Sequence, residues 1–292
     1  MHFVKARGIL GAALGKSSGM NVYRGCQHGC IYCDARSSCY QMDHLFEDIA
    51  VKENAPELLE GALKSRRRKG MIGTGSMSDP YMPLEEKLGL TRRCLEIIHR
   101  QGFGATVLTK SDLILRDLEL YRAIHLQAKA VVQMTLTTLD DRLSRLIEPN
   151  VCPSSRRVEV LRAFRDAGVP TVVWFCPVLP FLTDTRENIL SIVEACRDAG
   201  VKGIIWYGPG VTLRDGDREY FYAQLDRKFP GLKEAYIRTY GASYEVNSPN
   251  SRELNRLFHE TCEAFDIWHD NDQIFRFLTT LEEREPQLSF FD

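Results

Sequence analysis

The feature of this sequence with the clearest chemistry is a group of three cysteines within eight residues. Cys26, Cys30 and Cys33 are spaced C-x3-C-x2-C in a segment that also contains Gly25 and Gly29. Three thiolates from one glycine-containing loop can bind three irons of a [4Fe–4S] cluster and leave the fourth iron without a protein ligand. A cofactor that is chelated and reduced at the cluster needs such an open iron. The spacing therefore predicts Cys26, Cys30 and Cys33 as cluster ligands.

A zinc site is the alternative interpretation of the same cysteines. A structural zinc ion takes four ligands, usually from paired C-x2-C units, so His28 or Cys39 would have to supply the fourth. In that case the chain is a non-enzymatic, zinc-stabilised binding protein. A secreted disulfide framework does not fit, because nine cysteines in 292 residues are too few and too uneven. The cysteines indicate a reducing compartment.

Short apolar segments that alternate with amphipathic helices must position the cysteine loop. Most of these segments are continuously apolar, as strands covered on both faces should be. The predicted strands are residues 71–74, 105–109, 130–135, 171–175 and 203–207. Gly102, Gly168 and Gly200 stand where helices should end, each just before a strand. This alternation predicts right-handed βαβ units and a parallel sheet.

A further strand around residues 20–23 brings the count to six. We therefore expect an α/β fold, a partial (β/α)6 barrel with C-terminal helices, and a doubly wound open sheet is the alternative. After about residue 213 the strand pattern stops, and helices are predicted at 218–229, 232–240 and 251–265. The expected organisation is a partial barrel with the site at 1–213, a helical extension packed on it at 214–281, and a flexible tail at 282–292.

With Tyr32 before the third cysteine, the loop reads C-x3-C-x-aromatic-C, which resembles the signature of radical S-adenosylmethionine (SAM) enzymes. The resemblance implies a partial barrel, a [4Fe–4S] cluster and bound SAM. In that family SAM chelates the open iron, and an external one-electron reductant supplies an electron to the cluster. SAM is then cleaved to methionine and a 5′-deoxyadenosyl radical that abstracts hydrogen from a substrate. The cofactor carries this chemistry, and the protein orients it and excludes water.

Motifs after the next three strands resemble the spore photoproduct lyase-like branch of that superfamily, especially its short, uncharacterised members. They are Ser78-Asp79-Pro80-Tyr81, Thr109-Lys110-Ser111 and Thr135-Leu136-Thr137-Thr138, followed by Arg145-Leu146-Ile147-Glu148-Pro149 and Arg156-Arg157. The resemblance implies that Ser78 and Lys110 contact SAM, with Tyr32, Asp79 and Thr135 as further cofactor-binding candidates. The motif positions agree with barrel physics, because barrel sites are built at the carboxyl ends of strands.

Two departures from that branch concern the return of hydrogen to the substrate. The lyases have a hydrogen-donating cysteine where this chain has Ser76, and a tyrosine where it has Asp34. Reversal of a thymine dimer by that route is therefore not expected. Cys39, near the cluster loop, and Cys176, at the end of the fifth strand, are the candidate substitute donors. Each also fits a plain packing role, since cysteine is often a small buried hydrophobe.

The C-terminal segment Gln287-Leu288-Ser289-Phe290-Phe291 resembles the peptide with which bacterial proteins dock on the DNA polymerase sliding clamp. The alternative is that its two phenylalanines pack against the barrel. The basic run at 64–69 either contacts phosphates or is solvated surface. These features favour DNA or another nucleic acid as the substrate, in a lyase-like repair or modification reaction. A peptide or a small metabolite is the alternative substrate.

The overall composition sets limits on partners and location. The net charge of −1 excludes a protein coated along its length with nucleic acid but allows one local basic groove. No segment approaches the roughly 18 apolar residues of a membrane span, and no signal peptide is recognisable, so we expect a cytoplasmic protein without membrane contact.

Overall fold

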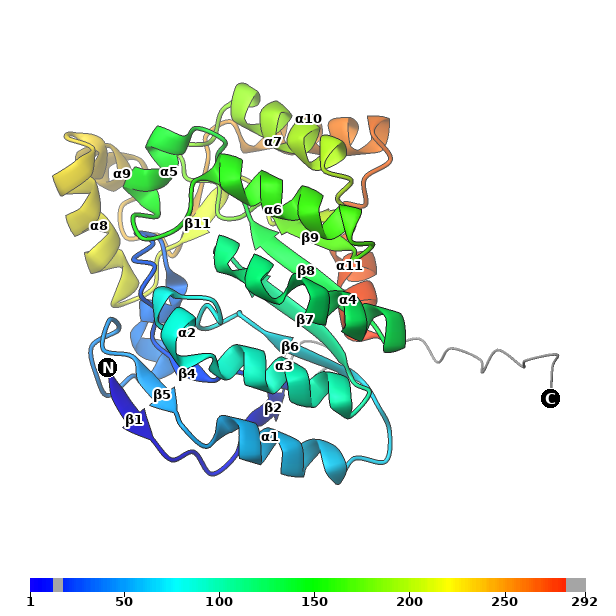
Figure 1. Ribbon diagram of the computed structural model, residues 1–292. Helices are drawn as coiled ribbons and strands as arrows, with labels where there is room; N and C mark the ends of the chain where they lie inside the picture. The colour runs from blue at the N-terminus through cyan, green and yellow to red at the C-terminus, as the bar shows by residue number, and fades with distance from the viewer. Residues whose placement is uncertain (13–17, 282–292) are drawn as a thin grey trace.

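The computed structural model describes residues 1–12 and 18–281 and is built around one curved, seven-stranded sheet (Figure 1). In spatial order the strands are β10 (Gly203–Ile205), β9 (Thr171–Trp174), β8 (Ala130–Thr135), β7 (Gly104–Thr109), β6 (Met71–Thr74), β3 (Ser18–Met20) and β2 (Leu10–Ala12). The first six are parallel, and β2 is antiparallel to β3. The partial (β/α)6 barrel is thus confirmed. Because the parallel strands never reverse their order, the doubly wound alternative is wrong.

Helices cover the convex face of this sheet. They are α1 (Ala55–Lys64), α3 (Leu90–Arg100), α4 (Leu118–Gln127), α6 (Ser154–Asp166) and α7 (Arg186–Asp198), with α10 (Ser251–Ala264) packed on α7. Along β7, Ala105 and Val107 belong to the core beneath the helices, whereas Thr106 and Leu108 face a cavity inside the barrel. Gly102, Gly168 and Gly200 all have positive φ, as predicted for residues that end helices.

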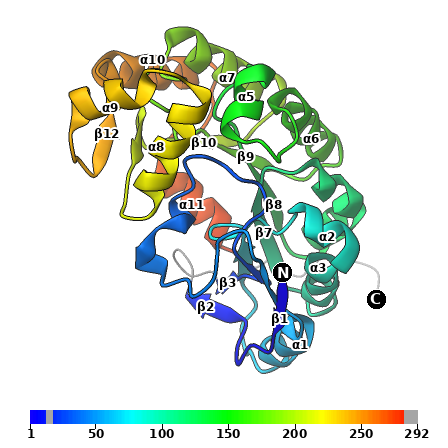
Figure 2. The same cartoon turned by 90° about the vertical axis from the view of Figure 1, so that its left-hand side faces the viewer.

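The helix α11 (Asn271–Thr279) lies on the opposite, concave face of the sheet, where Figure 2 shows it inside the curve of the strands. Its Ile274 and Leu278 pack against strand residues that point into the barrel, namely Val131, Val172 and Ile205. No helix is predicted from the sequence at these positions. The barrel interior is therefore partly filled by a C-terminal element of the described chain.

The C-terminal region also contains a strand that the sequence analysis missed. β12 (Glu245–Asn247) pairs antiparallel with β11 (Gly210–Thr212), beside α8 (Asp217–Lys228) and α9 (Leu232–Tyr240). The prediction that strands stop near residue 213 is therefore wrong. Only Val246 of β12 is buried, so the strand has no apolar run from which it could be predicted. The proposed domain limits at 213 and 281 stay predictions.

The remaining elements surround the carboxyl edge of the barrel. A three-stranded sheet contains β1 (His2–Val4), β5 (Ala50–Lys52) and β4 (Tyr23–Arg24), and the short helices are η1 (Asp34–Arg36), η2 (Ser38–Tyr40), η3 (Asp112–Asp117), α2 (Pro83–Leu88) and α5 (Asp141–Ile147). The strand expected at 20–23 is instead two strands, because β3 ends at Met20 and Tyr23 begins β4. The clamp-like segment lies outside the described residues. No described helix combines the length and the apolar character needed to cross a bilayer.

Candidate functional site

Cys26, Cys30 and Cys33 line one cavity at the carboxyl edge of the barrel, which we call the cysteine cavity. Its empty volume of about 950 Å³ includes space open to solvent. Burial raises the pKa of the Cys26 and Cys30 thiols to about 12 and that of Cys33 to about 11. The free thiols are thus protonated at neutral pH, and metal binding must displace their protons.

The cysteine loop is shaped by close backbone approaches. Gly25 has φ of +88°, and a Cβ atom there would lie 2.4 Å from the carbonyl oxygen of Phe46, so only glycine fits. The backbone nitrogen of Ile31 donates to the carbonyl of Ile147 at 2.9 Å. Ser78 donates its hydroxyl to the Gly25 carbonyl at 2.8 Å. The loop is therefore held by segments that follow β6 and end α5.

The Asp79 carboxylate joins this loop to the ends of two strands. One oxygen accepts hydrogen bonds from the backbone nitrogen of Tyr81 at 2.8 Å and from the Thr109 hydroxyl at 2.7 Å. The other accepts from the backbone nitrogen of Lys110 at 2.8 Å and lies 3.2 Å from Nε2 of the buried His28. With both oxygens engaged, Asp79 positions its neighbours, and direct contact with a cofactor stays a prediction.

Each predicted cofactor-binding residue lines the same cavity as the cysteines: Tyr32, Ser78, Asp79, Lys110 and Thr135. Burial alone would lower the pKa of Lys110, but the thiolate forms of Cys30 and Cys33 and the carboxylates of Glu148 and Asp79 raise it well above its ordinary value. Lys110 therefore presents a positive charge close to the cysteines. The structure brings the whole set together, and their individual contacts with SAM remain predictions.

A buried ion pair behind the cysteine loop joins Glu148 and Arg157, two residues of the lyase-like motifs to which sequence reasoning gave no role. Arg157 and Glu148 are both fully buried, with 2.5 Å between their charged atoms. Glu148 also accepts a hydrogen bond from the Tyr32 hydroxyl, and Arg157 donates to the carbonyl of Thr135 at 3.1 Å. The pair thus connects the aromatic residue of the cysteine motif with the end of β8. One signal was available, because Arg157 interrupts the apolar stripe of its helix.

The two candidate hydrogen donors have different surroundings. Cys176 lines the cysteine cavity beside Trp174, and burial raises the pKa of its thiol to about 12. Cys39 is exposed in η2, where its sulfur accepts a hydrogen bond from Arg214 at 3.3 Å, and it is not among the described residues that line the cavity. Ser76, which replaces the lyase cysteine, lines the cavity as well.

Within residues 1–12 and 18–281, no three His, Cys, Asp or Glu side chains are gathered around the position of a single metal ion. The three cysteine thiols nevertheless share the cysteine cavity, and three sulfur donors with one corner left for another ligand suit an iron–sulfur cluster. The donor chemistry therefore fits the cluster predicted from the sequence.

Fold and site together define a class, an open α/β barrel with a three-thiol loop at the carboxyl edge of its parallel strands. The chain belongs to the radical SAM superfamily, whose sequence profile matches residues 20–186. Members of this family use a [4Fe–4S] cluster and SAM, so both cofactors of the sequence analysis are confirmed. The zinc-stabilised, non-enzymatic alternative is wrong.

Two relatives with similar sequences are both named as uncharacterised proteins. A protein of Methanocaldococcus jannaschii is 34% identical over 172 residues, which cover 58% of this chain and 63% of that protein. The chain therefore spans less than two thirds of that relative. A Mycobacterium bovis protein is 30% identical over 243 residues, which cover 81% of this chain and 71% of the relative.

Solved structures with a similar fold include spore photoproduct lyases. A lyase complexed with a dinucleoside spore photoproduct has a TM-score of 0.64 at 12% identity, with 90% of this chain and 78% of that chain covered. A lyase variant with bound AdoMet and the same photoproduct has a TM-score of 0.61 at 13% identity, with 85% and 74% covered. At such low identity the likeness concerns the fold alone.

Proposed function

We propose that Cys26, Cys30 and Cys33 hold the [4Fe–4S] cluster, and that SAM binds in the cysteine cavity and generates a radical that takes hydrogen from a nucleic acid. One observation carries the cofactor part of this proposal. The three cysteines share a single cavity with Ser78, Lys110 and Thr135, which come from three different strand ends. Convergence of motifs that are far apart in sequence is what a built cofactor site requires.

The protein residues around the cavity have separate tasks in this proposal. The positive charge of Lys110 attracts the carboxylate of SAM, and Asp79 fixes the backbone that carries Lys110. When bound and reduced by an external one-electron donor, the cluster supplies the electron that cleaves SAM. Glu148 and Arg157 hold Tyr32 and the end of β8 in place. The buried cavity walls keep water away from the radical.

We assign Cys176 as the candidate hydrogen donor. Apart from the three proposed ligands, it is the one cysteine among the described residues that line the cavity. A thiol can give a hydrogen atom to a carbon radical, and one electron from the external donor together with a proton then returns the resulting thiyl radical to the thiol. The hydroxyl of Ser76 has a much stronger bond to its hydrogen. Cys39 is the weaker candidate because its sulfur is exposed and engaged by Arg214.

Two observations support a nucleic acid as the substrate, in a repair or modification reaction. Solved lyases of similar fold hold a dinucleoside photoproduct. The segment Gln287-Leu288-Ser289-Phe290-Phe291 also resembles sliding-clamp ligands, with Phe290 where leucine is usual. Deletion of residues 287–292 should abolish binding to the purified clamp, and retained binding would remove the clamp from the proposal.

The test of the cofactor assignment is anaerobic reconstitution followed by iron and sulfide analysis, electron paramagnetic resonance and a SAM cleavage assay. With dithionite and SAM, the wild-type protein should form 5′-deoxyadenosine. Cys26→Ala, Cys30→Ala and Cys33→Ala should each lose the cluster signal and the cleavage. Cys39→Ala is the matched control and should retain both. A cysteine variant that still cleaves SAM reductively would contradict the assignment.

The substrate class is tested with the same reconstituted protein. Formation of 5′-deoxyadenosine should increase when oligodeoxynucleotides or damaged DNA are added, because substrate commonly promotes productive cleavage of a bound cofactor. A mixture of tryptic peptides serves as the comparison. Stimulation by peptides with no response to DNA or RNA would favour the peptide alternative and end the nucleic acid proposal.

A further inference from the structure

The cysteine cavity continues into two neighbouring cavities with different walls. An inner cavity inside the barrel shares Ser76, Met77, Leu108 and Trp174 with it. A third cavity contains Arg24 and Lys52, and it shares Ala35, Tyr40, Met77 and Ser78 with the cysteine cavity and Asn21 and Met77 with the inner cavity. Met77 lines all three. We call the second and third cavities the inner lobe and the basic lobe of one chamber.

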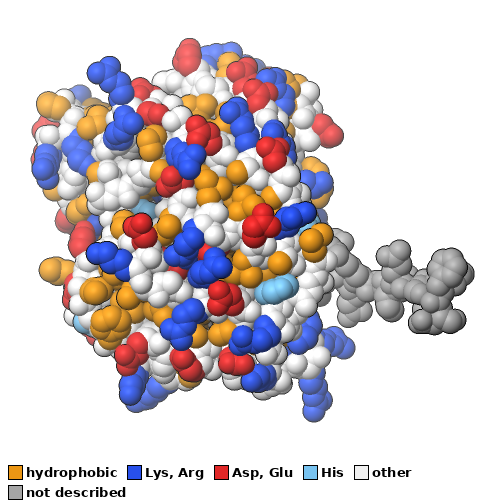
Figure 3. Space-filling view, viewed as in Figure 1, with side chains coloured by type: hydrophobic (Ala, Val, Ile, Leu, Met, Phe, Trp, Pro, Cys, Tyr) orange, Lys and Arg blue, Asp and Glu red, His pale blue; other side chains and the backbone are white. Residues whose placement is uncertain are grey.

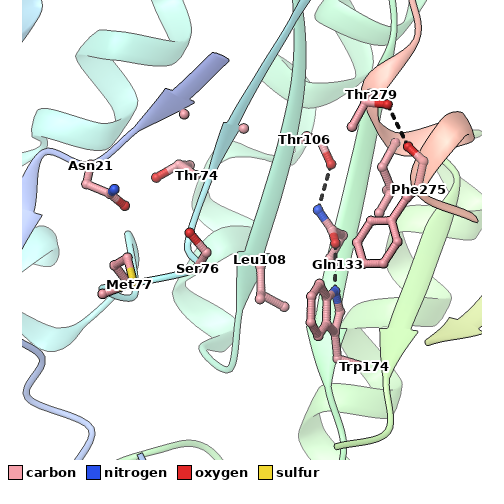
Figure 4. A pocket seen from close by; sticks show the side chains of 13 residues that line it. Asn21, Thr74, Ser76, Met77, Thr106, Leu108, Gln133, Trp174, Phe275 and Thr279 are labelled. Carbon is pink, nitrogen blue, oxygen red and sulfur yellow. Dashed lines mark hydrogen bonds between the residues drawn. The ribbon is translucent and has the colours of Figure 1, made fainter. Parts of the chain in front are cut away.

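The described residues that line the inner lobe include several polar side chains but none that is charged. Across it, the Gln133 side chain donates to the Thr106 hydroxyl at 2.7 Å and accepts from the indole nitrogen of Trp174 at 2.7 Å. Figure 4 shows this row facing Asn21, Thr74 and Ser76. A charged ligand group would lose hydration there without gaining a counter-ion, so the lobe suits a neutral group.

Asn21 adds a reason to expect a ligand with an N–H donor. Its side-chain oxygen is buried and accepts no hydrogen bond from the described part of the chain. A buried carbonyl without a donor is costly unless a ligand or water supplies one. Asn21 lines both the inner and the basic lobe, so a ligand that engages it stands where the two meet.

The basic lobe has two cations and no acidic residue among the described residues that line it. Arg24 is oriented by hydrogen bonds to the carbonyls of Tyr40 and Gln41, both at 2.9 Å. Lys52 is half-buried beside it, and burial together with the charge of Arg24 lowers the pKa of Lys52. In the described ranges, neither side chain forms an ion pair with a carboxylate.

This lack of a counter-ion contrasts with the basic residues nearby. Arg36 pairs with Glu47, and Arg214 pairs with Asp34 at 3.0 Å. The face of the molecule in Figure 3 likewise shows basic and acidic side chains interspersed. Two adjacent cations inside a cavity repel each other until an anion binds between them. Arg24 and Lys52 are therefore arranged for an anionic group of a ligand.

We infer that the chamber binds one nucleotide unit of the substrate, with its uncharged base in the inner lobe and a phosphodiester at Arg24 and Lys52. A nucleotide combines a flat, neutral, hydrogen-bonding group with an adjacent permanent anion, which is the combination of the two lobes. The base then borders the cysteine cavity through Ser76 and Trp174. The inference rests on the proposed function and names the chemical class of its substrate.

The test compares thymidylyl-thymidine with its uncharged methylphosphonate analogue by calorimetric titration of the SAM-bound, cluster-containing protein. The wild type should bind the phosphodiester about tenfold more tightly, the effect of one charge-assisted contact. Lys52→Gln should remove most of this preference, and Lys52→Arg should keep it. Lys64→Gln, in the basic run at 64–69, is the matched surface control and should behave as the wild type.

Several results would overturn the inference. The first two are the absence of thymidylyl-thymidine binding and equal binding of the two dinucleotides by the wild type. The others are an unchanged preference for the phosphodiester in Lys52→Gln, or an equal loss of that preference in Lys64→Gln. Each sample is also assayed for iron and for 5′-deoxyadenosine. If the wild type cleaves SAM but does not prefer the phosphodiester, the nucleotide inference fails and the cofactor assignment stands. If the Cys30→Ala protein still cleaves SAM, the proposed function fails instead.

Discussion

The carboxylate of Asp79 accepts a hydrogen bond from the backbone nitrogen of Lys110 at 2.8 Å, so one buried side chain joins the loop after β6 to the end of β7. The same carboxylate engages Tyr81 and Thr109 and faces His28. A residue that the sequence pointed to as a cofactor contact therefore also sets the backbone from which Lys110 extends.

Asp79→Asn tests this positioning role. The amide keeps one acceptor oxygen but presents an N–H group where the Lys110 nitrogen needs an acceptor. The free energy of unfolding of the apoprotein should fall by about 1–3 kcal/mol, measured by urea denaturation. SAM affinity of the reconstituted protein should fall as well. The Asp43→Asn protein, changed at an exposed residue, is the control. Equal stabilities of the two variants would show that Asp79 does not stabilise the backbone at Lys110.

Lys110→Ala separates SAM binding from cluster binding. Because Lys110 supplies positive charge beside the cysteines without being a thiol ligand, its loss should weaken SAM binding while the iron content stays at the wild-type level. The expected loss is about tenfold or more, as for removal of one charge-assisted contact. SAM titration monitored by electron paramagnetic resonance provides the measurement. Unchanged affinity would exclude Lys110 from the SAM site.

The buried Glu148–Arg157 ion pair should stabilise the folded protein only when both partners are present. Removing one partner leaves an uncompensated buried charge, so Glu148→Gln and Arg157→Met should each lower the free energy of unfolding by about 3–5 kcal/mol. The double variant should recover part of the loss. Arg256→Met, in the exposed pair with Glu260, should change stability by about 1 kcal/mol or less. Additive losses in the double variant would argue against direct coupling.

Asp217 should make the stability of the protein depend on pH. Burial and the charge of Asp34 raise the pKa of Asp217 to about 7. The pKa of an aspartate in the unfolded chain is about 3.9, so between about pH 4 and pH 7 the folded protein binds the proton more tightly than the unfolded chain. The stabilising contribution of the neutral form is full below about pH 4 and is lost as the pH rises through about 7.

Asp217→Asn should therefore match the wild type near pH 4 and be the more stable protein near pH 8. Between these values the difference should widen by up to about 1.4 kcal/mol per pH unit. Urea denaturation at several pH values measures the difference. Asp43→Asn should show no such divergence, and a constant offset between Asp217→Asn and the wild type would refute the raised pKa.

The two candidate hydrogen donors, Cys176 and Cys39, should respond differently to substitution. Cys176→Ser should leave cluster content and SAM affinity near the wild-type values. If the Cys176 thiol returns hydrogen to the substrate radical, the variant should form product at least about tenfold more slowly. Cys39→Ser should turn over as the wild type does. Product analysis after addition of substrate and dithionite decides between them. Full turnover by Cys176→Ser would remove the assignment of this residue.

The barrel strands could be predicted from sequence because they are covered on both faces. Residues 71–74 and 130–135 were placed without error, since each is a short apolar run between helix ends. The β3 strand was displaced by two residues, and β12 was missed. β3 has only three residues, one of them Gly19, and β12 buries only Val246 and pairs with β11 far back in the chain, so neither strand has an apolar run that marks it.

Much of the candidate site could be predicted for a different reason. Motifs at strand ends must meet at one edge of a parallel barrel, which is why Ser78, Lys110 and Thr135 converge on the cysteines. The Glu148–Arg157 pair and the basic lobe could not be predicted in this way. Charged residues look like surface in a sequence, and only the fold shows that Arg157 is enclosed or that Lys52 lacks a counter-ion.

The position of α11 has a consequence for how the protein is made on the ribosome. The inner lobe takes one wall from Gly19 and Asn21 and another from Phe275, Leu278 and Thr279. Synthesis proceeds from the N-terminus, so the cysteine loop emerges long before the helix that closes the barrel interior. A nascent chain therefore exposes its cysteine loop before the inner lobe is complete. Delivery of the cluster only after release of the full chain would prevent uncoupled SAM cleavage during that interval.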